Sequence, residues 1–259
     1  MDLSSSGPAY PTQPIQERQL RQKDNPRAPF LGENKVPDPA PDPRVQKTYF
    51  TSMTPFRRVV QPILLSGFRV MTKIVVERVE QMPVSGPVIL AANHLTNYDV
   101  FFLQVAIRRP IFYMGKAELF RRPAMDWSLR QLGSFPVYRS AGDEWAMRHA
   151  ERVLRAGEVL GMFPEGTRSK GMGLKPAKTG VARLALAVGC PIQPVALHGP
   201  QYMFQRLRRR TQVTVTFGEL IYPEEEDTPL GLTDRFMFAI ATMLPVEMRG
   251  AYRSRPPGF

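Results

Sequence analysis

Short apolar runs alternate with helix-like segments from residue 74 onward, and this alternation limits the fold more than any other feature of the sequence. Brief runs rich in Val, Ile, Leu and Phe are typical of buried strands, and helical spacing of apolar residues marks the segments between them. We expect strands at Ile74–Glu80, Pro87–Ala92, Ile111–Gly115, Phe135–Arg139, Val159–Phe163, Ile192–Leu197 and Val213–Phe217. We expect helices at Asn97–Ile107, Pro123–Leu132, Asp143–Ala156, Thr179–Val188 and Asp234–Leu244. The pattern predicts an α/β fold with a mixed, largely parallel sheet covered by helices.

The composition divides the chain into three regions. Residues 1–45 contain nine of the 26 prolines among polar residues, which predicts a disordered, Pro-rich arm. Residues 46–73 predict an amphipathic, membrane-associating helical segment, and residues 74–250 predict the main folded domain. The last expected helix, Asp234–Leu244, is too short to span a bilayer and is either part of the core or a second membrane contact.

The segment Phe56–Lys73 combines dense apolar residues with positive charge. Its cations are Arg57, Arg58, Arg69 and Lys73. The uncharged run between them, Val59–Phe68, is about half the roughly 20 residues that a spanning helix needs. A helix of this kind can lie in the interface of an anionic membrane, or it can pack on the domain with its arginines directed outward.

The net charge of +12 indicates an anionic partner, which could be a membrane surface, a phosphorylated substrate or a nucleic acid. The single cysteine, Cys190, excludes an intramolecular disulfide. The first residues, Met1–Tyr10, lack the basic and apolar regions of a signal peptide.

A histidine and an aspartate occur where the second strand passes into a helix, in the segment Ala91–Asp99. The turn can fold Asp99 back towards His94, because the two residues are five positions apart. A carboxylate that accepts one ring N–H leaves the other nitrogen free to act as a base. The alternative is a capping aspartate beside a structural histidine.

A second cluster, Phe163–Ser169 with the sequence FPEGTRS, follows a later strand directly. Gly166 can bring the backbone close to a ligand, and the planar guanidinium of Arg168 is suited to phosphate. The alternative is a surface turn with an ion pair between Glu165 and Arg168.

Together, Asn93-His94…Asp99 and the complete FPEGTRS stretch resemble the glycerophosphate/lysophosphatidate acyltransferase family, in that family's order and at a similar distance. Two weaker blocks also resemble it: Lys116–Phe120 continuing to Gly133–Arg139, and Pro191–Ala196. The resemblance covers roughly residues 74–220.

The resemblance implies roles for particular residues. His94 would be the general base and Asp99 the residue that orients it. Glu165, Gly166, Thr167 and Arg168 would bind the acceptor phosphate and shape the site. Further cations around it would be Lys116, Arg139 and Lys178, although Lys178 could equally be a solvated residue at the start of a helix.

The implied reaction transfers a fatty acyl group from acyl-CoA or acyl carrier protein to the sn-2 hydroxyl of lysophosphatidate, giving phosphatidate in phospholipid biosynthesis. Glycerol 3-phosphate or another lyso-lipid remains an alternative acceptor, and a non-catalytic membrane-binding module is an alternative function. We expect no cofactor beyond the acyl donor, and a peripheral or monotopic position on the cytoplasmic side of the cell membrane. Nucleic acid is not expected as a partner, because the basic run Arg206–Arg210 lacks interleaved aromatic residues.

We expect direct transfer between two bound substrates, because the chain has no Gly-x-Ser-x-Gly nucleophile motif. A backbone N–H near Gly166 is the expected donor to the tetrahedral oxyanion. The three histidines are widely separated, so no metal site is expected.

Overall fold

The computed structural model describes residues 42–138, 142–203 and 210–254. The chain divides between Gln46 and Lys47, and the described end of the first unit contains a short 3-10 helix at Pro43–Gln46. The arm expected at residues 1–45 lies almost wholly outside the described residues. The description below concerns the chain from Lys47 onward.

The second unit contains a seven-stranded sheet with the order β1-β7-β6-β2-β5-β3-β4. The strands are β1 (Thr72–Glu77), β2 (Val88–Ala92), β3 (Ile111–Lys116), β4 (Ser134–Val137), β5 (Val159–Met162), β6 (Ile192–His198) and β7 (Thr211–Phe217). All neighbouring pairs are parallel except β6 and β7. The prediction of a mixed, largely parallel sheet is therefore confirmed.

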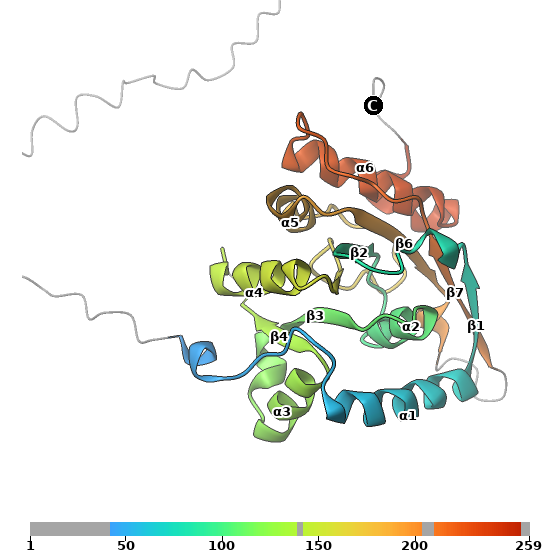
Figure 1. Cartoon of the computed structure of the whole chain (residues 1–259). Helices are drawn as coiled ribbons and strands as arrows, with labels where there is room; N and C mark the ends of the chain where they lie inside the picture. Colours follow the sequence, from blue (N-terminus) through green and yellow to red (C-terminus); the bar gives the residue numbers. More distant parts are fainter. Residues whose placement is uncertain (1–41, 139–141, 204–209, 255–259) are drawn as a thin grey trace, which may run out of the picture. The chain divides into compact units, whose positions relative to one another are not determined.

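Helices cover both faces of this sheet (Figure 1). On one face lie α4 (Glu144–Arg155), α5 (Gly180–Val188) and α6 (Pro229–Thr242). On the other lie α1 (Pro55–Met71) and α2 (Asp99–Ala106), while α3 (Pro123–Gln131) packs against β4 and the 3-10 helix η4 (Ala117–Phe120). Shorter 3-10 helices are η3 (Val79–Gln81), η5 (Pro200–Tyr202), η6 (Val246–Met248) and η7 (Gly250–Tyr252). All five residues of β2 are completely buried, as expected for a central strand covered on both faces.

Two elements differ from their expected limits or environment. The first strand ends at Glu77 rather than Glu80, because Arg78 adopts a left-handed conformation (φ 57°) and the chain turns into η3. Helix α6 begins at Pro229, five residues before the expected start, with the Thr228 hydroxyl accepting the N–H of Gly231. It packs on β6 and α5 and buries Phe236, Met237 and Ile240, so the core alternative holds for this segment.

Helix α1 is fastened to the domain through its first turn. The Thr54 hydroxyl accepts the N–H of Arg57 and donates to the carbonyl of Gln131, at the end of α3. The Arg57 guanidinium donates to Gln61, Gln104 and the carbonyl of Ile111, and lies 5.0 Å from the centre of the Phe112 ring. Burial lowers the pKa of this guanidinium to about 10.

This placement corrects one expectation, because Arg57 is only 2% exposed and is not among the outward-facing cations of the segment. Arg58, Arg69 and Lys73 are exposed. The apolar side chains exposed on the same helix are Val59, Ile63, Leu64, Val70 and Met71. None of the described helices is both long enough and apolar enough to cross a bilayer.

Candidate active site

Two motif clusters meet at the carboxyl edge of the central strands. Strands β2 and β5 are parallel neighbours with Ala91 opposite Met162, so three residues further along His94 comes level with Glu165. The chain leaves β2 towards β3, β4 and β5, then returns across β2 to β6. Ligand sites of open α/β sheets lie at such reversals. Strand register therefore brings together segments that are 71 residues apart in sequence.

His94 and Asp99 form a hydrogen-bonded pair. The His94 Nδ1 atom lies 2.8 Å from Asp99 Oδ2. An ionised carboxylate can only accept, so Nδ1 carries the proton and Nε2 presents a lone pair. Nε2 has no hydrogen-bond partner among the described residues, and the His94 side chain is 15% exposed whereas that of Asp99 is fully buried. The pair thus has one inward-facing anion and one accessible base.

Asp99 is held by several donors besides the imidazole. Its Oδ2 also accepts the N–H groups of Leu95 (2.6 Å) and Thr96 (2.9 Å), and its Oδ1 accepts the Thr96 hydroxyl (2.7 Å). Asp99 is the first residue of α2, where the helix dipole favours a negative charge. These contacts prevent the carboxylate from rotating.

Asn93 fixes the turn on its other side. Its side-chain amide donates to the carbonyl of Leu197 (3.0 Å), and its oxygen accepts the N–H of Leu197 (2.7 Å). This reciprocal pair extends the contact between β2 and β6 one residue beyond the end of β2.

Glu165 joins the two motif loops. It is 4% exposed, and its two carboxylate oxygens accept the N–H groups of His94 (2.9 Å) and Lys175 (3.0 Å). Burial raises the pKa of the Glu165 carboxyl, and the two amide donors partly oppose that rise. Each oxygen accepts one backbone N–H, and through these contacts Glu165 positions the His94 loop. The alternative ion pair with Arg168 is not formed.

The remaining contacts of His94 come from the FPEGTRS loop. The N–H and hydroxyl of Ser169 both donate to the His94 carbonyl, at 2.7 and 3.3 Å. The imidazole stacks on Phe163 at a centroid distance of 4.0 Å, and Phe163 stacks in turn with Tyr113 at 6.4 Å. Backbone and ring of His94 are thus both held in place.

Cationic side chains surround the open side of this loop. Arg168 and Lys178 are exposed, and the alkyl part of Lys178 passes close to Gly166. Gly166 has φ +66°, a conformation that favours glycine. Lys175 donates to the carbonyl of Arg168. Together these residues form a surface suited to a phosphate group.

Two other expected site residues, Thr167 and Lys116, have no contact that joins them to these side chains. Thr167 is exposed and no contact joins it to the other site residues. Lys116 pairs with Glu118 at 3.3 Å, at the end of β3. Arg139 lies outside the described residues.

The N–H of Gly166 itself is not free to act as the expected oxyanion donor. The N–H of Gly166 donates to the carbonyl of Phe163 at 3.0 Å, which closes the turn. The following amides, those of Thr167 and Arg168, have no acceptor among the described residues, so either can serve a ligand.

Several residues that shape the site were not assigned a role from the sequence. Phe163 and Asn93 belong to the recognised motifs, and their contacts show why those positions matter. Lys175 contributes through its backbone N–H, and a backbone contact leaves no sign in the residue type.

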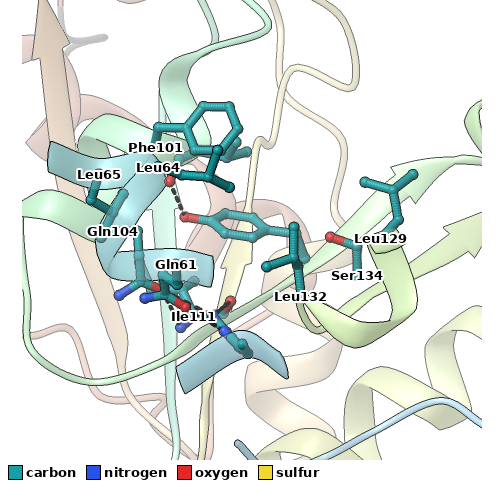
Figure 2. Close-up of a pocket in the computed structure, with 12 residues that line it drawn as sticks. Gln61, Leu64, Leu65, Phe101, Gln104, Ile111, Leu129, Leu132 and Ser134 are labelled. Carbon is teal, nitrogen blue, oxygen red and sulfur yellow. Dashed lines mark hydrogen bonds between the residues drawn. The ribbon is translucent and has the colours of Figure 1, made fainter. Parts of the chain in front are cut away.

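An apolar pocket lies beside the buried tyrosine of this ring stack. Its volume is about 90 Å³, and α1, α2, β3 and the end of α3 form its wall. Leu64 and Phe101 approach it from one side, and Leu129 and Ser134 from another (Figure 2). Its lining residues are Arg57, Gln61, Leu64, Leu65, Val100, Phe101, Gln104, Ile111, Tyr113, Leu129, Leu132 and Ser134.

Known proteins are similar to this chain in sequence. The acyltransferase family model matches residues 73–198. A 1-acyl-sn-glycerol-3-phosphate acyltransferase of Bacillus subtilis is 29% identical over 144 residues, which cover 55% of this chain and 71% of that protein. A protein of the same name from Borreliella burgdorferi is 31% identical over 134 residues, which cover 51% of this chain and 54% of that protein. The chain therefore spans about half of the second relative.

A solved structure shares the fold. The crystal structure of the 1-acyl-sn-glycerophosphate acyltransferase PlsC from Thermotoga maritima superposes with a TM-score of 0.58 and 23% sequence identity, covering 73% of this chain and 82% of that chain. The family match and both motif clusters fall within residues 73–198, and in this region the chain is similar to proteins named 1-acyl-sn-glycerol-3-phosphate acyltransferase.

Proposed function

We propose that the protein is a 1-acylglycerol-3-phosphate O-acyltransferase, which moves a fatty acyl group from acyl-CoA or acyl carrier protein to the sn-2 hydroxyl of lysophosphatidate. The observation that carries the proposal is the accessible Nε2 of His94, whose other nitrogen is bound to the buried Asp99 beside a cationic loop. The names of the relatives support lysophosphatidate as the acceptor.

In the proposed mechanism, His94 Nε2 accepts the proton of the acceptor hydroxyl while its oxygen attacks the thioester carbonyl. A positioned base of this kind contributes about 10²–10⁴ in rate. The amides of Thr167 and Arg168 would donate to the tetrahedral oxyanion. The intermediate collapses as the carbon–sulfur bond breaks, and the protonated imidazole returns its proton to the thiolate. The products are an ester and a free thiol, and His94 is regenerated.

The acceptor phosphate would bind beside Gly166, between the side chains of Arg168 and Lys178. Both are exposed, and the contacts of the loop leave the Arg168 guanidinium available for two parallel hydrogen bonds to phosphate. Buried Glu165 then acts indirectly, by holding the loop against the backbone of His94.

Helix α1 would bring the enzyme to its lipid substrate at the cytoplasmic face of an anionic membrane. Its exposed apolar residues and cations form the mixed surface of an interfacial helix. Near its C-terminal end, Phe68 stacks on Phe101 at 4.6 Å and contacts Tyr98 at 6.0 Å, at the start of the helix that holds Asp99. A lipid bound along α1 therefore has a short path to the His94–Asp99 pair.

The end of the acyl chain would occupy the apolar pocket. Tyr113 lines that pocket and stacks with Phe163, which stacks with His94, so the pocket lies two aromatic rings from the base. Its volume accommodates only a few methylene groups, so the rest of the chain would lie along the rings.

The test is an acyl-transfer assay on purified wild-type protein and His94→Ala. Labelled acyl-CoA and acyl carrier protein are offered with lysophosphatidate, glycerol 3-phosphate and other lyso-lipids in parallel. We expect transfer to lysophosphatidate, lost in His94→Ala and reduced in Arg168→Ala. Arg148→Ala, which removes an exposed arginine from α4, is the matched control and should retain activity. A fully active His94→Ala protein would refute the role of the base, and an inactive wild type would favour a non-catalytic module.

A further inference from the structure

A second exposed surface combines apolar and cationic side chains next to α1. It consists of residues 119–127, from η4 into α3, and we call it the η4–α3 surface. Leu119, Met125 and Trp127 are about half exposed, and Arg121 and Arg122 are exposed beside them. A tryptophan in this position leaves much of its apolar area in contact with water unless another surface covers it.

The η4–α3 surface adjoins the first turn of α1. The Trp127 ring meets the Phe56 ring edge to face at 4.7 Å, and the Thr54 hydroxyl donates to the carbonyl of Gln131. Figure 1 shows α3 beside the N-terminal end of α1. The exposed residues of the two helices therefore form neighbouring parts of one region.

The charges of this surface favour an anionic partner. Glu118 forms its ion pair with Lys116 and interacts electrostatically with Arg121, whereas Asp126 is buried against Lys47 and Arg130. Neither carboxylate forms an ion pair with Arg121 or Arg122 among the described residues. A second copy of the chain would bring further arginines against the same patch, which disfavours self-association. An anionic lipid surface offers both negative headgroups and an apolar interior.

We propose that the η4–α3 surface is a second membrane-contacting element, with Trp127 and Met125 at the boundary between headgroups and acyl chains and Arg121 and Arg122 among anionic headgroups. The inference rests on the membrane docking proposed for α1 and extends it. Tryptophan concentrates at this depth of a bilayer because its ring is apolar and its N–H is polar. Two adjoining contacts, one along α1 and one at the η4–α3 surface beside its first turn, would fix the tilt of the domain and keep the carboxyl edge of the sheet at a constant height above the membrane.

The two tryptophans of the chain allow a direct test. In Trp145→Phe the emission comes from Trp127, and in Trp127→Phe it comes from Trp145, which packs against His149 and Tyr49. We expect vesicles containing phosphatidylglycerol to shift Trp127 emission to shorter wavelength, and lipids brominated on the acyl chain to quench it. Trp145 emission should not respond. If Trp145→Phe fails to fold, the difference between wild type and Trp127→Phe gives the same reading.

A binding measurement separates the contribution of this surface to vesicle binding from that of the protein's net charge. Arg121→Gln with Arg122→Gln should weaken partitioning to anionic vesicles about 30-fold, because each cation near such a surface contributes about fivefold. Arg148→Gln with Arg155→Gln on α4 removes the same total charge and should have little effect. The proposal would be overturned if the two double variants lost vesicle binding equally. It would also be overturned if Trp127 emission did not change in protein that still sediments with vesicles. A blue shift that depends on protein concentration without lipid would overturn it as well, since it would show self-association. No acyl donor is present, so a failure of the proposed catalysis would leave these results unchanged.

Discussion

Replacing Asp99 with asparagine separates the charge of this residue from its geometry. The Asp99 Oδ2 atom accepts two backbone N–H groups, from Leu95 and Thr96, which cannot reverse their direction. The asparagine oxygen must therefore take the same place and still accept the His94 Nδ1 proton. The new amide N–H₂ can donate to the Thr96 hydroxyl, which rotates to accept. The four contacts survive, and only the charge is lost.

The expected loss of activity is correspondingly moderate. Hydrogen bonds to a charged group contribute about 1.5–3 kcal/mol and neutral ones about 0.5–1.5 kcal/mol, so the protonated imidazole loses about 1–2 kcal/mol of stabilisation. This corresponds to a kcat/KM about 5- to 30-fold lower. Asp99→Ala instead leaves the two amides without an acceptor and the imidazole unoriented, so we expect a loss of about 10²–10⁴ and clear destabilisation.

The assay measures kcat/KM from thiol release, with acyl-CoA and lysophosphatidate in mixed micelles, alongside chemical denaturation. Asp126→Asn is the matched control, because Asp126 is a buried aspartate that pairs with Lys47 and Arg130 outside the site. It should lower stability and leave kcat/KM nearly unchanged. If Asp99→Asn were as inactive as Asp99→Ala while folding normally, the claim that the amides enforce its orientation would be refuted.

Three further predictions concern stability, membrane binding and chain length. Burial lowers the pKa of His149 from 6.5 to about 4, so the unfolded chain binds a proton that the folded chain excludes, and stability should fall by about 3 kcal/mol as the pH drops from 6.5 to 4. Urea titrations at the two pH values should show that His149→Phe removes this component, and an unchanged pH dependence would contradict it. Replacing Arg58, Arg69 and Lys73 with Gln should weaken sedimentation with anionic vesicles about 100-fold, and unchanged binding would exclude α1 as the docking element. Leu132→Trp should fill the apolar pocket and shift the preference towards shorter acyl chains in a competition assay; an unaltered chain-length profile would place the chain elsewhere.

The order and type of the elements could be predicted from the sequence because each strand is short, apolar and separated from the next by a helical segment. The seven expected strands correspond to β1–β7, with boundary shifts where local backbone conformation intervenes. The left-handed Arg78 is one such position, since nothing in its residue type requires φ 57°. The start of α6 at Pro229 is indicated by Thr228-Pro229, a capping residue followed by proline. The expected start, Asp234, depends instead on the apolar residues that follow it.

The site could be predicted only in part, because residue types do not specify partners. The His94–Asp99 contact followed from the spacing, whereas the use of both Glu165 oxygens by backbone amides depends on the register of β2 and β5. Arg57 shows the same limit. Its neighbour Arg58 is exposed, and only the packing of α1 against Phe112 determines which of two adjacent arginines is buried.

The hydrogen bonds that hold His94 have a consequence for substrate choice. Its N–H, its carbonyl and its ring each bind a different partner, so the base stays where it is when a ligand arrives. The side chains proposed to bind the acceptor phosphate, those of Arg168 and Lys178, are exposed. Changes in them should alter which headgroup is accepted while leaving the proton-transfer geometry intact, so one rigid base could serve a family of enzymes with different lipid acceptors.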